Sequence, residues 1–103
     1  MPKKTSRAVE TLSSKQEWTF LSNHAHVLIC LYRDENVRLR DLAFNVGITE
    51  RAVIRIIEDL EAANVLVRFK EGRRNKYKIF DNIPLRHKLE SHKTIGDLLK
   101  LLK

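Results

Sequence analysis

Cysteine is nearly absent from this chain of 103 residues, since Cys30 is its only one. A single cysteine forms no internal disulfide, which fits a reducing compartment. The three glycines, Gly47, Gly72 and Gly96, are scattered and make no glycine-rich phosphate loop. No serine, histidine and acidic residue stand together in a recognisable catalytic motif. We therefore do not expect an enzyme.

A long hydrophobic run is also missing. The longest apolar stretch, AHVLICLY, is far shorter than the roughly 20 residues of a membrane-spanning helix. No signal-peptide core follows the basic N-terminus. We therefore expect a cytoplasmic protein without a membrane partner.

Positive charge is present in excess. The chain holds 20 Lys and Arg against 13 Asp and Glu, a formal net charge of +7. This balance suggests a polyanionic partner, nucleic acid first and an anionic membrane second. The length fits one domain with a modest core, which pairing with a second copy could stabilise.

The stretch from Val37 to Ala63 predicts two short helices joined by a tight turn. Apolar residues recur at intervals of three and four around Arg40–Asn45, as in a helix with one buried face. Gly47 then interrupts the pattern and tolerates the left-handed backbone of a sharp turn. Thr49 is a suitable N-cap for the second helix.

The second helix has two different faces. Val53, Ile57 and Leu60 fall at i, i+4 and i+7. The opposite side carries charged residues, namely Arg51, Arg55, Glu58 and Asp59. The β-branched run AVIRII favours a strand by propensity, but a period of two would place Arg55 with Val53 and Ile57. A helix, a glycine turn and an amphipathic helix are typical of a helix-turn-helix, whose second helix enters the major groove. An ordinary helical hairpin is the alternative.

The preceding segments are expected to support this unit. Residues 1–16 are polar and basic and are interpreted as a mobile arm, with a solvated tail as the alternative. Ser22 can cap a helix over Asn23–Arg33, and Val37–Leu39 is a candidate short strand.

A basic β-hairpin is predicted after the second helix, which Asn64 can end in a left-handed conformation. Residues 65–70 and 76–80 alternate in polarity and flank a five-residue loop, EGRRN. The hairpin carries six Lys and Arg against one Glu, which leaves +5. A charge run is usually a solvated face, but this one follows a helix-turn-helix and therefore favours nucleic acid.

The C-terminal segment predicts two more helices. Pro84 can start the first, with Leu85 and Leu89 on one face, and the second spans Ile95–Leu102. The leucine-rich last helix has little left to pack against in so small a domain. We therefore expect it to form a homodimer contact, with Trp18 and Phe20 as companions.

The order of helix, short strand, helix-turn-helix and basic hairpin over Leu21–Phe80 resembles the winged helix-turn-helix of MarR-like and ArsR-like transcription regulators. The stretches that carry this resemblance are LRDLAFNVGITERAVIRIIEDLEAANVLVR and GRRNKY. WTFLSNHAHVLICL, GITERAV and GRRNKY, with the tail segments PLRHKLE and IGDLLKLL, further resemble a group of small winged-helix regulators.

The resemblance implies a set of DNA-binding positions. In the major groove they are Thr49, Arg51, Ala52, Ile54 and Arg55, and in the wing they are Arg73, Arg74 and Lys76. Ile54 stands where a small polar residue is often found, so it either touches a thymine methyl group or packs.

His24, His26 and Cys30 are candidate metal ligands, since His26 and Cys30 are one helical turn apart and ArsR-like regulators often sense metals. The recognition helix itself has no Cys or His. Cys30 lies in an apolar helix and is more typical of a core residue. We therefore expect neither a metal nor another cofactor, and the sequence does not name an effector.

The predicted fold is mainly α with a small β-hairpin. It consists of a basic arm over 1–16, a winged helix-turn-helix over 17–80 and a helical extension over 81–103. The predicted function is a homodimeric, sequence-specific regulator that binds double-stranded DNA. The alternative is a protein-interaction module without specific DNA binding. RNA binding is disfavoured, because Phe69, Tyr77 and Phe80 alternate as strand-core residues.

Overall fold

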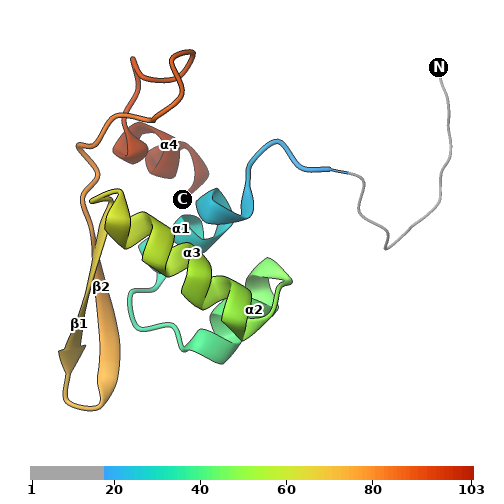
Figure 1. Ribbon diagram of the computed structural model, residues 1–103, viewed down its shortest axis with the longest axis vertical. Helices are drawn as coiled ribbons and strands as arrows, with labels where there is room; N and C mark the ends of the chain where they lie inside the picture. Colours follow the sequence, from blue (N-terminus) through green and yellow to red (C-terminus); the bar gives the residue numbers. More distant parts are fainter. Residues whose placement is uncertain (1–17) are drawn as a thin grey trace, which may run out of the picture.

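The computed structural model describes residues 18–103, which combine four α-helices with one two-stranded antiparallel sheet (Figure 1). The predicted arm over residues 1–16 lies outside the described part. In chain order the elements are α1 (Asn23–Arg33), α2 (Leu39–Val46), α3 (Glu50–Ala62), β1 (Leu66–Glu71), β2 (Arg74–Ile79) and α4 (Ile95–Leu102). Among these helices, none combines the length and the apolar character that crossing a membrane requires.

The first three helices pack against one another because each buries one apolar face. Their buried residues form one continuous core, which also takes in residues of the hairpin and of α4. From the three helices the buried residues are Val27, Leu28, Leu31, Leu42, Ala43, Val53, Ile56, Ile57 and Leu60. The predicted helical faces are thereby confirmed, α1 with its predicted bounds and its Ser22 cap.

The turn between α2 and α3 is built as the sequence predicts. Gly47 has a φ of +87°, in the left-handed region, and its N–H donates to the carbonyl of Ala43 at 2.8 Å. The Thr49 side chain then accepts a hydrogen bond from the Ala52 N–H at 3.0 Å. At the far end of α3, Asn64 has a φ of +62°, which confirms its left-handed conformation.

The hairpin differs from its prediction in the loop. Glu71 pairs with Arg74, so the connection is only Gly72 and Arg73, and the predicted five-residue loop is wrong. Gly72 has a φ of +66°, which suits a two-residue turn. Glu71 and Asn75 are polar residues that do not favour a strand by type, but both are paired in the two-stranded ladder.

Three further predictions need correction. Val37–Leu39 is not a strand, because Leu39 already begins α2 and Arg38 is its N-cap. No helix starts at Pro84, which instead forms an isolated bridge with Thr94. The last helix is not without packing partners, because Ile95 and Leu99 are buried in the main core.

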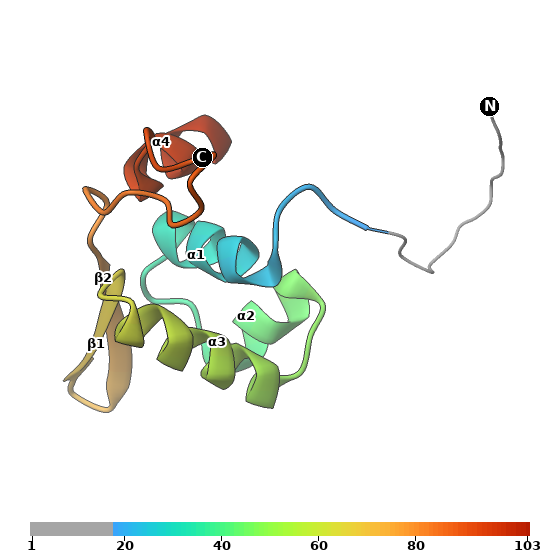
Figure 2. The same ribbon diagram turned by 45° about the horizontal axis from the view of Figure 1, so that its top comes forward.

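The C-terminal helix α4 is capped and placed by specific contacts. Thr94 and Asp97 form a reciprocal capping box at its start. Figure 2 shows α4 covering α1 on the side away from α2 and α3. Within α4, Leu99 is buried and Leu101 is 78% exposed, so only part of the leucine-rich surface faces solvent.

Candidate nucleic-acid interface

Helix α3 presents Arg51 and Arg55 to solvent, followed along the helix by the acidic Glu58 and Asp59, because its opposite face is buried in the core. Val53, Ile57 and Leu60 are buried, whereas Arg51 and Arg55 are exposed. Within residues 18–103 neither arginine side chain makes a hydrogen bond or an ion pair. Both guanidinium groups are therefore free to meet a ligand, in positions fixed by the packing behind them.

The other predicted positions on α3 differ in availability. Thr49 is exposed, but its hydroxyl oxygen already accepts from the Ala52 N–H. Ala52 is half-buried, and it offers only a methyl group to a groove. Ile54 is exposed and not packed in the core, so it is open to apolar contact with a ligand.

The three cations predicted for the wing are not equivalent. Arg73 lies in the exposed turn of the hairpin. Arg74 donates from Nη2 to the backbone carbonyl of Asn36 at 2.7 Å. Lys76 Nζ lies 2.8 Å from Glu71 Oε1. Only Arg73 of the three is without a protein partner in the described residues.

The Lys76–Glu71 pair also changes the acid–base behaviour of both groups. A hydrogen bond from Lys76 lowers the pKa of the Glu71 carboxyl, and the positive charge of Lys76 adds to the effect. The same hydrogen bond raises the pKa of Lys76. Both groups are therefore charged at neutral pH, and they largely cancel each other toward a distant phosphate.

Arg68 is a further hairpin cation with a structural partner. Its Nη2 lies 3.3 Å from Glu61 Oε1, and both side chains are partly buried. This ion pair joins β1 to α3. The cations of the hairpin that lack an ion pair or hydrogen bond in the described chain are therefore Lys70, Arg73 and Lys78.

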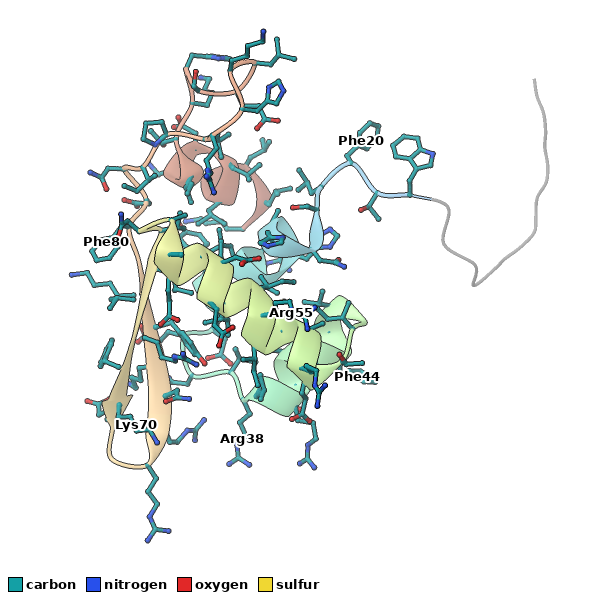
Figure 3. All side chains as sticks on the ribbon, in the orientation of Figure 1. Phe20, Arg38, Phe44, Arg55, Lys70 and Phe80 are labelled. Atoms are coloured by element: carbon teal, nitrogen blue, oxygen red, sulfur yellow. The ribbon has the colours of Figure 1, made fainter. Side chains whose placement is uncertain are left out.

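Arginines at the start of α2 were missed by the sequence prediction. Arg38 and Arg40 are both exposed. Figure 3 shows Arg38 pointing toward the end of the molecule at which the hairpin turn lies. The Arg74 contact with Asn36 brings β2 next to this segment. The signal was the sequence RLR at the start of the helix-turn-helix, where Val37–Leu39 suggested a strand instead.

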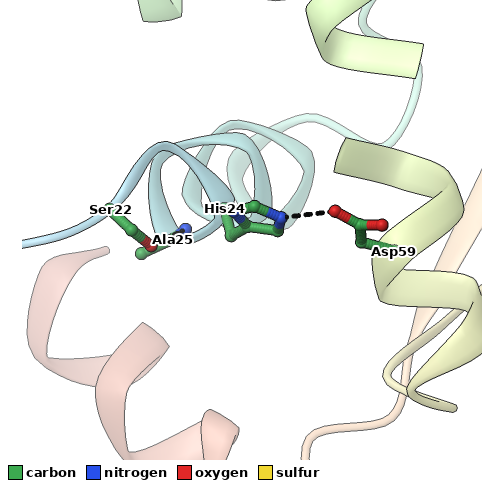
Figure 4. A network of polar contacts seen from close by, with 4 residues as sticks. All are labelled: Ser22, His24, Ala25 and Asp59. Atoms are coloured by element: carbon green, nitrogen blue, oxygen red, sulfur yellow. Dashed lines mark hydrogen bonds and ion pairs between the residues drawn. The ribbon is translucent and has the colours of Figure 1, made fainter. Parts of the chain in front are cut away.

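The histidines of α1 make contacts that account for their positions. His24 Nε2 lies 2.9 Å from Asp59 Oδ2 of α3 (Figure 4), and His26 Nδ1 lies 3.0 Å from Asn23 Oδ1. Cys30 is half-buried, and burial raises the pKa of its thiol. Between residues 18 and 103, His, Cys, Asp and Glu nowhere gather in a group of three that could hold a metal ion.

A cavity of about 890 Å³ lies between α1, the end of α3 and the segment that leads into α4. Leu28, Leu60, Ile95 and Leu98 contribute to its apolar lining, and Asp59 is one of its polar residues. Its volume is in the range of small-molecule sites.

Comparisons of the chain with protein-family models and with curated proteins find no match.

Proposed function

We propose that this protein is a winged helix-turn-helix regulator that binds double-stranded DNA sequence-specifically, with α3 in the major groove and the hairpin along flanking phosphates. The observation that carries the proposal is that Arg51 and Arg55 are exposed on a helix whose other face is buried, with no hydrogen bond or ion pair from either side chain among residues 18–103. The order α1, α2, α3, β1, β2 and the left-handed turn at Gly47 are compatible with that fold.

The proposal divides the work between two kinds of contact. Arg51 and Arg55, one turn apart, would donate paired hydrogen bonds to guanine edges and so read sequence. Arg73 would bind phosphate and so supply affinity with little discrimination. Arg74 and Lys76 can assist only by leaving Asn36 and Glu71 or by sharing their charge. Arg38 joins the phosphate-binding group, since it projects to the same end of the molecule.

The proposal also includes a homodimer and a cytoplasmic location, where such a regulator would meet chromosomal DNA. Leu101 on α4, together with Trp18 and Phe20, provides exposed apolar side chains for a contact between copies. Two recognition helices related by a twofold axis would enter successive major grooves.

Selection of bound duplexes from a random DNA pool tests the proposal. Wild type should enrich a palindromic site, whereas the double variant Arg51→Ala/Arg55→Ala should enrich none. Arg86→Ala is the matched control, because Arg86 is exposed and lies outside the proposed interface. A wild type that enriches no sequence would contradict specific DNA binding.

A second candidate function is favoured by Phe44, whose side chain on α2 is 83% exposed. A large exposed ring next to a recognition helix suits a protein-interaction module. Phe44→Ala would then abolish partner capture and leave DNA binding unchanged. Light scattering of the purified protein, with and without a duplex from the selection, separates the two candidates. Only a DNA-binding regulator should gain the mass of the duplex.

A further inference from the structure

One face of the hairpin carries three exposed apolar side chains. In the observed register, Val67 stands opposite Lys78 and Phe69 opposite Lys76, and Phe80 extends the same face opposite Val65. We call Val67, Phe69, Lys76, Lys78 and Phe80 the outer hairpin face. Figure 3 shows Phe80 pointing away from the helices.

This face is apolar, and its available positive charge comes from Lys78, because Lys76 is paired with Glu71. Val67, Phe69 and Phe80 are 41%, 47% and 37% exposed. On the opposite face Leu66 and Tyr77 are buried in the core. Of the three aromatic residues expected in the strand core, only Tyr77 is therefore buried there. Phe69 and Phe80 are exposed, so RNA or single-stranded DNA binding is not disfavoured on their account.

Positive charge accompanies the exposed rings. The Lys78 ammonium lies 5.8 Å from the centroid of the Phe80 ring, within the range of a cation–π interaction. Lys78 has no acidic partner among residues 18–103. The face thus pairs a solvent-exposed ring with an ammonium group that remains available to an anion.

A hollow of about 620 Å³ adjoins the face and adds further aromatic and cationic groups. Tyr32, Phe69 and Tyr77 contribute to its lining, together with Arg33 and Lys78. Glu35 and Asp81 also lie along it. The acidic groups offer acceptors for the exocyclic amino groups of bases, and Lys78 suits phosphate, whereas Arg33 already donates to the carbonyl of Leu102 at 2.6 Å.

We propose that the outer hairpin face binds unpaired nucleotides of a single-stranded nucleic acid. Exposed rings beside ammonium groups match a partner that offers flat base surfaces and phosphates together. A duplex offers phosphates but keeps its base faces stacked inside, so Phe69 and Phe80 would have nothing to stack on. The two rings stand about 14 Å apart along the sheet, from four residues at about 3.4 Å each, so they would hold different bases of one strand.

Fluorescence anisotropy with the full-length protein tests the proposal. The probes are labelled 15-mers of deoxythymidine and of uridine, an abasic 15-mer of the same charge and a blunt 15-base-pair duplex. Wild type should bind the base-containing strands more tightly than the abasic strand. Phe69→Ala should weaken single-strand binding by roughly 5- to 150-fold and leave duplex binding unchanged.

Two further variants separate stacking from other causes. Phe69→Leu keeps an apolar side chain but removes the ring, so it should lose single-strand affinity as Phe69→Ala does. Leu89→Ala is the control, since Leu89 is an apolar residue that is 75% exposed and lies outside the hairpin. Thermal unfolding by circular dichroism confirms that each variant is folded.

Equal affinity for the abasic strand would overturn the proposal and leave charge as the only attraction. Full single-strand binding by Phe69→Leu would also overturn it, because stacking on the ring would then not account for the affinity. The thymidine and uridine probes show whether DNA or RNA is preferred, and either preference supports base stacking. Duplex selection tests the regulatory function independently, so failure of one proposal is distinguishable from failure of the other.

Discussion

Helix α3 and the hairpin both carry cations, but the two elements use them differently. On α3, Arg51 and Arg55 have no protein partner in the described structure. In the hairpin, Arg68 is paired with Glu61, Arg74 with the Asn36 carbonyl and Lys76 with Glu71. The number of cations in a segment therefore does not give the number available to a ligand.

The difference follows from how each element is held in place. The buried face of α3 fixes its position, so its arginines have no structural duty. A two-stranded hairpin buries little and is marginally stable alone. Here, Arg68 ties β1 to α3, and Arg74 ties β2 to the segment before α2. Part of the hairpin's charge is thus used to hold the hairpin itself.

The largest expected effect concerns the buried face of α3. Ile57 is 1% exposed, so Ile57→Ala should lower the free energy of unfolding by about 2–5 kcal/mol. Leu89→Ala is the control, because that side chain is 75% exposed and should change stability by less than about 0.5 kcal/mol. Urea denaturation measures both. Equal small losses would show that core packing does not position α3.

The next effect concerns base reading by α3. Arg55→Lys keeps the charge but loses the planar fork, so discrimination against a substituted base pair should fall by roughly 1–3 kcal/mol. Binding to random duplex should hardly change. Competition titrations of a selected site against single-base variants measure this. A uniform loss on every sequence would mean that Arg55 contacts phosphate.

A smaller effect is expected for the hairpin's attachment. Arg74→Ala removes the hydrogen bond to Asn36, which should lower stability by about 1 kcal/mol and speed amide exchange in β2. Arg73→Ala, in the turn, should change neither. If both variants behave alike, the contact with Asn36 does not hold the hairpin.

Salt dependence sharpens the comparison within the hairpin. Arg73→Ala should flatten the slope of log affinity against log salt by about one unit per lost phosphate contact. Lys76→Ala should change it less, because Glu71 already neutralises Lys76. Glu71→Gln should steepen the slope by freeing that lysine. Equal changes for Arg73→Ala and Lys76→Ala would contradict the assigned difference in availability.

The smallest effect is a local change with pH. The carboxyl of Glu71 has a lowered pKa in the folded protein, so the ion pair is complete above the unfolded-state pKa and is lost as the pH falls through the lowered value. An NMR titration should find the pKa of Glu71 below its ordinary value. Lys76→Gln should return it upward, whereas Lys78→Gln should not. A Glu71 pKa at its ordinary value would show that the ion pair with Lys76 does not form in solution.

Much of the fold could be predicted because its elements depend on local patterns. The spacing of Val53, Ile57 and Leu60 defines α3, and Gly47 and Thr49 define the turn before it. These signals come from residues close in sequence. The loop length of the hairpin could not be predicted in this way, because Glu71 and Asn75 are polar and join the ladder through cross-strand hydrogen bonds.

The remaining misses come from contacts between distant residues. Leu85 and Leu89 have helical spacing after Pro84, but Pro84 itself forms a bridge with Thr94, and no helix forms there. The partners of Arg68 and Arg74 lie 7 and 38 residues away, so their loss of availability is invisible in a charge count. Exposure of Phe69 likewise depends on which hairpin face the helices cover, and alternation alone does not say which.

The segment between the hairpin and α4 is closed at its base by paired contacts. The N–H of Ile95 donates to the carbonyl of Ile83, and that of Gly96 to Asp81, at 2.9 and 2.8 Å. A Cβ at Gly96 would stand 2.9 Å from the same Asp81 oxygen, so only glycine allows this approach. Because both ends are anchored, residues 86–92 form a side loop whose length can vary without moving α4, and insertions tolerated by the fold belong there.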